Sequence, residues 1–346
     1  MIAAGITALV VRPSPAWVER AYVNGGYALW ERTAFHLTSP IPWSLGDVAV
    51  VAGVVSAAFI VLRAVRQMRA RGGRVLPDAA LTIATLAGLY AVWFVASWGW
   101  CYDRAPVTTR VVYRPEAVNP DALARLRREA IAQVNALAPL AHARAAEPLA
   151  IGALRAAWLP VVRAMGDEWS PAVGAPKATL AAPFLAASGT EGFINPFTLE
   201  AQLAPDLLWF EVPFALAHEW THLAGFARED EANYAAIVAC LRSHDPVQRY
   251  SGWLELFLYL PPLPHYPRST FSPLVWSDFA AIRARNARHV NLTLARWSWR
   301  TYDAYLQANH VAAGIANYGE VTQLLLGIER NARGLPVSRS SDGSTR

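Results

Sequence analysis

The chain has 346 residues and a formal net charge of +5, and 54% of its residues are hydrophobic whereas only 16% are charged. Its mean hydropathy of +0.21 is not that of an ordinary soluble enzyme. The small positive charge, concentrated partly in one run of arginines, argues against nucleic acid as a partner. Two cysteines are too few for a disulfide framework. We interpret Cys240 as a buried hydrophobic residue, the alternative being a bridge to Cys101 outside the cytoplasm.

The first eleven residues, MIAAGITALVV, are apolar but too few to cross a bilayer. They carry no basic segment or cleavage site of a signal peptide, so we interpret residues 1–11 as the remnant of a truncated first span. Residues 14–42 would then connect this span to the next one. This connector contains the amphipathic segment AWVERAYVNGGYALWERTAF.

Two further spans are expected at about 46–63 and 79–102. The second contains no charged residue and is long enough to cross the hydrocarbon core. The first has a shorter uncharged run, which flanking apolar residues and a snorkelling Arg63 can extend. At the exit of the second span, an aromatic belt is expected from Trp98, Trp100 and Tyr102.

Arginines without a neighbouring acidic residue fill the loop between these two spans: Arg63, Arg66, Arg69, Arg71 and Arg74. Such loops stay in the cytoplasm. We therefore predict a multi-pass protein of the inner (plasma) membrane, with the lipid bilayer as a partner. Everything after Tyr102 would lie on the extracytoplasmic side.

We expect three regions: a membrane anchor at 1–104, an extracytoplasmic domain at 105–333 and a disordered tail at 334–346. Helical periodicity after the start signal Asn119-Pro120-Asp121 indicates a mainly α domain. The exception is 178–212, where short apolar runs between Gly and Pro predict strands or extended loops. The expected fold is mainly α, with two or three membrane helices followed by a mostly helical domain that has a small β segment. The HExxH motif at 218–222 makes a zincin-like domain the expectation.

The sequence His218-Glu219-Trp220-Thr221-His222 is an HExxH motif. Residues four apart lie on one face of a helix, so both imidazoles can bind one Zn²⁺ ion. A catalytic zinc site needs a third protein ligand and one open position for water. Glu219 would then be the general base that takes a proton from this water.

The third ligand is expected shortly downstream, where Gly225 can end the first helix and an acidic cluster opens a second one. Glu229 is the first choice and Glu231 the alternative, because a helix that starts at Glu229 could direct either carboxylate toward the histidines. The oxyanion of the reaction could be stabilised by His244, Tyr250 or Tyr302.

These features predict a membrane-tethered zinc peptidase that hydrolyses a peptide or protein substrate. One alternative is an intramembrane metalloprotease, although the charged residues around the motif crowd into too short a segment for lipid. The other alternative is a non-enzymatic membrane scaffold with a structural metal site.

The chain resembles the DUF3810 family of bacterial membrane proteins, which are predicted zinc metallopeptidases. The resemblance lies in VERAYVNGGYALWER, IPWSLGDV, SWGWCYDRAP, Lys177 with GTEGFINPFTLEA, HEWTHLAGFAREDEANYAAIVAC, RYSGWLELFLYL and YDAYLQANHVAAGIANYGEV. It implies a membrane-anchored topology and metal ligation by His218, His222 and the cluster Glu229–Glu231. The segment ExxAN from Glu229 to Asn233 is similar to the helix that carries the third ligand in gluzincin peptidases. No substrate is implied.

Overall fold

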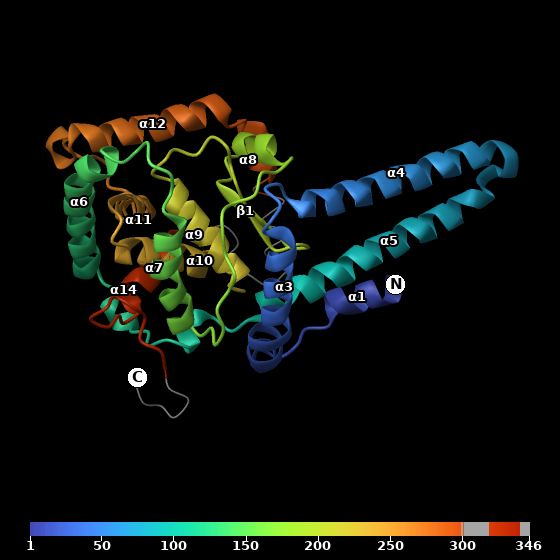
Figure 1. Ribbon diagram of the computed structural model, residues 1–346, viewed down its shortest axis with the longest axis horizontal. Coiled ribbons are helices and arrows are strands. Elements are labelled where there is room, and N and C mark those ends of the chain that lie inside the picture. Colours follow the sequence, from blue (N-terminus) through green and yellow to red (C-terminus); the bar gives the residue numbers. More distant parts are fainter. Residues whose placement is uncertain (299, 301–317, 340–346) are drawn as a thin grey trace.

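The computed structural model describes residues 1–298, 300 and 318–339. The protein is mainly helical, as predicted. A helical domain forms one end of the molecule, and a long hairpin of two helices projects from it (Figure 1).

The projecting hairpin consists of α4 (Leu45–Arg71) and α5 (Val75–Ser97). The segments Leu45–Met68 and Val75–Ser97 are long and apolar enough to cross a membrane, and few of their residues are buried inside the protein. The two expected spans are therefore present as candidate membrane helices. The second begins four residues earlier than predicted and ends at Ser97, before a 3-10 turn at Gly99–Asp103.

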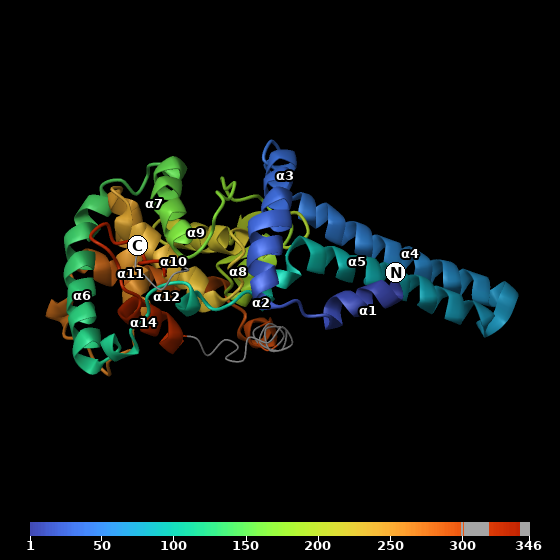
Figure 2. The same ribbon diagram turned by 90° about the horizontal axis from the view of Figure 1, so that it is seen from below.

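The apolar start of the chain forms helix α1 (Ile2–Val10), which lies along α5 (Figure 2). Gly5 and Gly88 make this close approach, since a Cβ atom on Gly5 would lie only 2.6 Å from the Gly88 Cα. A larger residue at either position would push the helices apart.

The expected connector between spans is instead part of the domain. It runs through α2 (Pro15–Trp17), a π-helical stretch Val18–Tyr27 and α3 (Ala28–Thr38). Val18 and Tyr27 are fully buried in the same core as the later helices, and the Tyr27 hydroxyl donates to the Leu223 carbonyl (2.8 Å). The anchor expected at 1–104 therefore shares a core with the domain expected after it, because this amphipathic helix packs its apolar face there.

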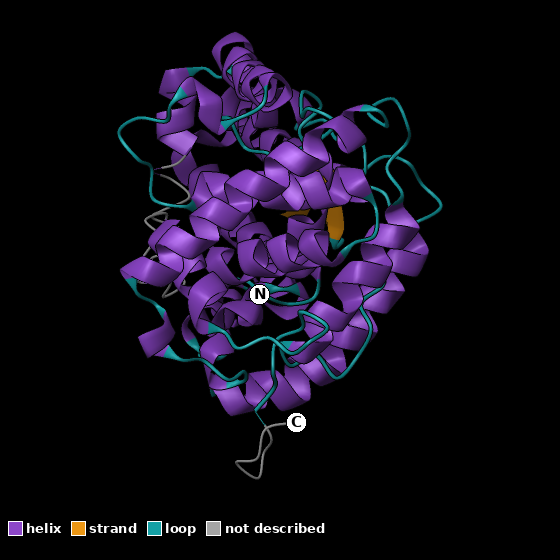
Figure 3. Cartoon of the chain, turned by 90° about the vertical axis from the view of Figure 1, so that its left-hand side faces the viewer, coloured by secondary structure: helices purple, strands orange, loops and turns teal. Residues whose placement is uncertain are grey.

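The domain is built around a central helix. This is α10 (Glu229–Arg242), which is buried from Asp230 to Cys240 and packs against its neighbours α7, α9, α11 and α14. Figure 3 shows the domain from the side opposite the projecting hairpin. The other long helices of the domain are α6 (Pro120–His142), α7 (Ile151–Ala164), α9 (Val212–Leu223), α11 (Pro246–Tyr259), α12 (Pro273–His289) and α14 (Tyr318–Gly327). The predicted start of α6 is confirmed, because the Asn119 side chain accepts from the Ala122 amide (2.9 Å).

The β segment predicted at 178–212 is only partly right. Strands β1 (Gly192–Asn195) and β2 (Glu200–Leu203) form an antiparallel hairpin with Gly192 opposite Leu203. The run before them forms helix α8 (Ala182–Ser188), because Pro183 occupies its first turn and Gly189 ends it at φ 71°. The run Leu207–Val212 contains no strand and leads into α9.

Lys177, the only lysine of the chain, has a structural role. Its ammonium donates to the carbonyls of Thr38 (2.8 Å), Ser39 (3.3 Å) and Ile41. It thus satisfies carbonyl groups at and just after the end of α3. Its backbone bridges to Gln202 of β2.

The tail predicted to be disordered is ordered over its first part. The Val337 amide donates to the Glu329 carbonyl (2.9 Å) and its carbonyl accepts from the Val112 amide (2.8 Å). Backbone hydrogen bonds thus order this segment, although its sequence has no periodic pattern of apolar residues. Residues 340–346 lie outside the described part of the chain. Both cysteines are buried and free, which confirms the interpretation of Cys240.

Glu31 of α3 should make the stability of the folded protein depend on pH. It is buried, and burial raises the pKa of its carboxyl to about 8, although the Ala172 amide donates to it (2.9 Å). A raised pKa favours the protonated form in the folded state. The stability that the protonated Glu31 carboxyl contributes to the folded state is fully present below about pH 4.5 and is lost as the pH rises through 8.

Glu31→Gln should therefore unfold like wild type near pH 4.5 but be more stable above pH 8, by up to about 5 kcal/mol. Thermal unfolding in detergent across this range measures the difference. The exposed Glu116→Gln is the control and should show no such divergence. A Glu31→Gln curve parallel to wild type would contradict the assignment.

Candidate metal centre

The histidines and the acidic cluster are brought together by a turn between two helices. His218 and His222 lie on α9, and Glu229 opens α10. Between them, Gly225 has φ 86°, and the amides of Gly225 and Phe226 bond back to the carbonyls of His222 (2.8 Å) and Thr221 (3.2 Å). The predicted left-handed glycine cap is confirmed, and it turns the chain back toward the histidines.

One ligand atom each from His218, His222 and Glu229 lies within 4.8 Å of the others. The two Nε2 atoms are 3.0 Å apart, and the Glu229 oxygens lie 3.3 Å from His218 Nε2 and 3.6 Å from His222 Nε2. Four-coordinate zinc with bonds of about 2.0–2.1 Å has ligand atoms roughly 3.3 Å apart. The three side chains therefore have the chemistry and the spacing to hold a metal ion.

The electrostatics of the cluster also suit a cation. Burial lowers the pKa of His222, but the neighbouring Glu229 outweighs this and raises it to about 9. Burial raises the pKa of Glu229, but the histidines hold it well below its usual range. The cluster thus favours positive charge between the imidazoles and the carboxylate, and a metal ion can supply it.

His222 is fixed in orientation from two sides. Its Nδ1 bonds to the Phe226 carbonyl (2.7 Å), which directs Nε2 toward the cluster. Trp98 Nε1 donates to the His222 carbonyl (3.2 Å). Trp98 is buried, so it belongs to the site and not to the predicted aromatic belt at the membrane surface. It immediately follows the last residue of α5, so its sequence position alone suggested a membrane anchor.

Glu219 lies beside the cluster under strand β1. It is 3% exposed, and one of its oxygens has no hydrogen-bond partner among the described residues. Burial raises the pKa of its carboxyl to about 7, although the two histidines oppose this shift. A Cβ atom at position 192 would collide with this carboxylate, so only glycine allows β1 to approach it.

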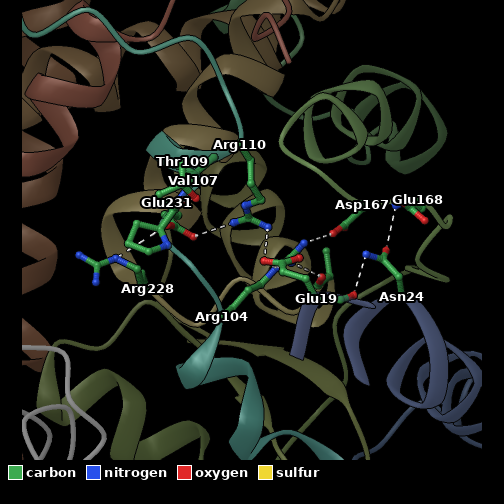
Figure 4. A network of polar contacts seen from close by, with 12 residues as sticks. Glu19, Asn24, Arg104, Val107, Thr109, Arg110, Asp167, Glu168, Arg228 and Glu231 are labelled. Atoms are coloured by element: carbon green, nitrogen blue, oxygen red, sulfur yellow. Dashed lines mark hydrogen bonds and ion pairs between the residues drawn. The ribbon is translucent and has the colours of Figure 1, made fainter. Parts of the chain in front are cut away.

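Glu231, the alternative third ligand, points away from the histidines. Its carboxylate accepts from the Val107 amide (2.7 Å) and lies 3.9 Å from the Arg110 guanidinium (Figure 4). Of the two candidates, Glu229 therefore lies in the cluster. Glu231 instead ties the start of α10 to the segment after the membrane hairpin.

Figure 4 shows the wider charge network to which Glu231 belongs. Arg104 is buried and pairs with Glu19 (2.9 Å) and Asp167 (2.8 Å), and Arg110 also pairs with Glu19 (2.9 Å). Both guanidinium groups lie over the Phe226 ring, at 4.2 and 5.2 Å from its centroid. Since the Phe226 carbonyl orients His222, this network supports the turn that carries the site. Sequence reasoning missed it, because its members lie far apart in the chain.

Two of the three candidate oxyanion-stabilising residues, His244 and Tyr250, do not join the cluster. His244 is exposed beyond the far end of α10, about 20 Å along the helix from Glu229. The Tyr250 hydroxyl is buried and donates to Asp278, which also bonds His142 (2.9 Å). Tyr302 lies outside the described residues.

The fold and site define a mainly helical protein with two candidate membrane helices and a partly buried cluster of two histidines and a glutamate. The model of the DUF3810 family, described as a protein of unknown function, matches residues 22–326, and the chain belongs to this family. The predicted family resemblance is confirmed. No curated protein and no solved structure matches the chain.

Arg104→Met should lower the free energy of unfolding by about 3–5 kcal/mol, because it leaves the buried Asp167 carboxylate without its charged partner. Denaturant unfolding in detergent measures this. Arg114→Met, which breaks an exposed pair with Glu329, is the control and should cost less than about 1 kcal/mol. Equal losses in the two variants would show that the network does not stabilise the domain.

Proposed function

We propose that this protein is a membrane-tethered zinc peptidase that hydrolyses peptide bonds with a metal-activated water. The observation that carries the proposal is the convergence of His218, His222 and Glu229 within 4.8 Å, with the carboxylate of Glu219 buried beside them. Two imidazoles and one carboxylate are the ligand set of many catalytic zinc sites, and they leave one position open for water.

Bound zinc would supply a water of lowered pKa and polarise the substrate carbonyl. The protein residues have distinct tasks around it. Glu219, whose carboxylate lies beside the cluster, accepts the proton of the attacking water and then passes it to the leaving amine. One of its oxygens has no hydrogen-bond partner in the described part of the chain, so it is able to accept a hydrogen bond from such a water.

Strand β1 offers a binding edge for the substrate backbone. Its residues Glu191 and Asn195 accept hydrogen bonds on the side of β2, from Ala204 (2.8 Å) and Leu199 (2.8 Å). Because backbone groups alternate in direction along a strand, Gly192 and Ile194 face the opposite edge. No described backbone group pairs with that edge. A substrate could add there as a further strand, next to Glu219.

The topology follows from the two candidate membrane helices and the arginines between them. Arg63 and Arg66 lie on the distal part of α4 and are exposed. If this end is cytoplasmic, as the positive-inside rule implies, the domain and its site lie outside the cytoplasm. The site would then act from the extracytoplasmic side of the inner membrane.

The geometry favours this proposal over an intramembrane protease. The histidines lie on α9, which has 12 residues and cannot span a bilayer, and the candidate membrane helices among the described residues are α4 and α5. A scaffold with a structural metal remains the competing function, and hydrolysis assays separate the two.

The ligand assignment predicts zinc stoichiometry. Elemental analysis of the detergent-purified protein should find about one zinc per chain in wild type and in Glu231→Gln, but little in His218→Ala and Glu229→Ala. Glu231→Gln is the matched control, since it removes a neighbouring carboxyl charge of the same helix turn. Loss of zinc in Glu231→Gln with retention in Glu229→Ala would reverse the assignment.

The general-base assignment predicts that Glu219→Gln retains zinc but loses peptide hydrolysis at least about 100-fold. A quenched fluorescent peptide library, assayed with the zinc content of each sample, measures both properties. Glu116→Gln, on an exposed turn, should keep wild-type activity. Normal hydrolysis by Glu219→Gln would refute the mechanism, and inactive zinc-loaded wild type would favour the scaffold.

A further inference from the structure

The β-hairpin beside the candidate site contacts the ends of both candidate membrane helices that lie nearest the domain. At the end of β1, the Asn195 side chain lies so close to Gly46, in the first turn of α4, that no Cβ atom would fit there. At the end of α5, the Ser97 hydroxyl donates to the Pro196 carbonyl (2.6 Å). The turn of the β-hairpin therefore lies against the ends of both helices.

The same turn reaches along the side of α5. The Phe197 ring packs against Tyr90 (5.5 Å between centroids) and Trp93 (5.1 Å). Tyr90 lies seven residues before the end of α5, which is about 10 Å along the helix. The tip of the hairpin thus reaches the level of the apolar part of the membrane helices.

A buried carboxylate fixes α4 to the other strand of the hairpin. Glu200 of β2 accepts from the amides of Leu45 (3.1 Å) and Gly46 (2.9 Å) and from the Ser44 hydroxyl (2.9 Å). It caps the N-terminus of α4, where the helix dipole favours negative charge. The distance between the site and the membrane helix is therefore set by a short and rigid connection.

That distance is small. Gly192, which touches the Glu219 carboxylate, and Asn195, which touches α4, are three residues apart on an extended strand. At about 3.3 Å per residue, the reacting position lies roughly 10 Å from the first turn of α4. On the other side, Trp98 connects the end of α5 directly to the His222 carbonyl.

Exposed apolar side chains lie close to the first turn of α4. Trp43 is 64% exposed just before α4, and Leu180, 74% exposed, has its amide bonded to Asp47 in the first turn of α4 (2.7 Å). Because these exposed apolar side chains lie beside the first turn of a candidate membrane helix, lipid is the occupant that suits them. The domain would then rest on the bilayer, with its site at the height of the headgroups.

We propose that the substrate is the juxtamembrane segment of a polypeptide anchored in the same bilayer, which rests on the peptidase function proposed above. β1 runs toward the membrane from Gly192 to Asn195, so a strand added antiparallel to it runs away from the membrane. The anchor of the substrate therefore precedes the cleaved bond, within roughly ten residues of it.

The test uses one library of mixed-sequence decapeptides, placed in a single-span carrier reconstituted with the zinc-loaded full chain in phosphatidylcholine vesicles. The library stands directly after the anchor, directly before it, or after the anchor and a thirty-residue Gly/Ser linker. A fourth sample contains the library as a soluble peptide. Mass spectrometry of new termini gives the rates, and Glu219→Gln gives the background.

The library directly after the anchor should be cleaved at least about tenfold faster than the other three. The linker sample controls for the local concentration that any tether provides. Equal rates near the membrane and beyond the linker would overturn the substrate class and leave the peptidase function standing. Equal or faster cleavage before the anchor would overturn the antiparallel direction, whereas no cleavage in any sample would refute both proposals.

Discussion

The turn at Gly225 is the constraint on which the site depends. Two imidazoles on one helix can share a cation, but a third protein ligand must arrive from a second helix that starts within a few residues. A positive φ at Gly225 turns the chain sharply enough for the first turn of α10 to face the last turn of α9. The Phe226 carbonyl, held within this turn, also orients His222. One local conformation thus places one ligand and aims another.

A buried network of charged residues stabilises this turn inside the apolar core. Arg104 and Arg110 stack on Phe226, and their charges are balanced by Glu19, Asp167 and Glu231. These residues come from four segments: the π-helical stretch Val18–Tyr27, the segment after α5, the turn after α7 and the start of α10. The network therefore joins distant parts of the chain. The site is rigid because the whole domain contributes to one turn.

Local signals predicted much of the fold and of the site. Residues close together in the sequence determine the HExxH spacing, the glycine cap, the start of α6 and the two apolar helices. The structure contains all of these features. The failures have two causes. Within the interval 178–212, predicted to form strands or extended loops, Ala182–Ser188 forms helix α8, whose proline start and glycine end are local signals that the short apolar run obscures. Trp98, predicted to lie in an aromatic belt, is instead buried by tertiary packing. No pattern of neighbouring residues encodes the contact between Trp98 and the His222 carbonyl or that between Gly192 and Glu219.

The choice between Glu229 and Glu231 shows most clearly where sequence reasoning ends. Both carboxylates lie in the first turn of α10, where negative charge is favourable, and residues two apart point to different sides of a helix. Which side faces the histidines depends on how α10 is rotated. Val107 and Arg110 set this rotation, because they supply the hydrogen bond and the charge that hold Glu231. Since Val107 follows the membrane hairpin by ten residues, the part of the chain that leads to the membrane also determines which carboxylate reaches the candidate metal centre.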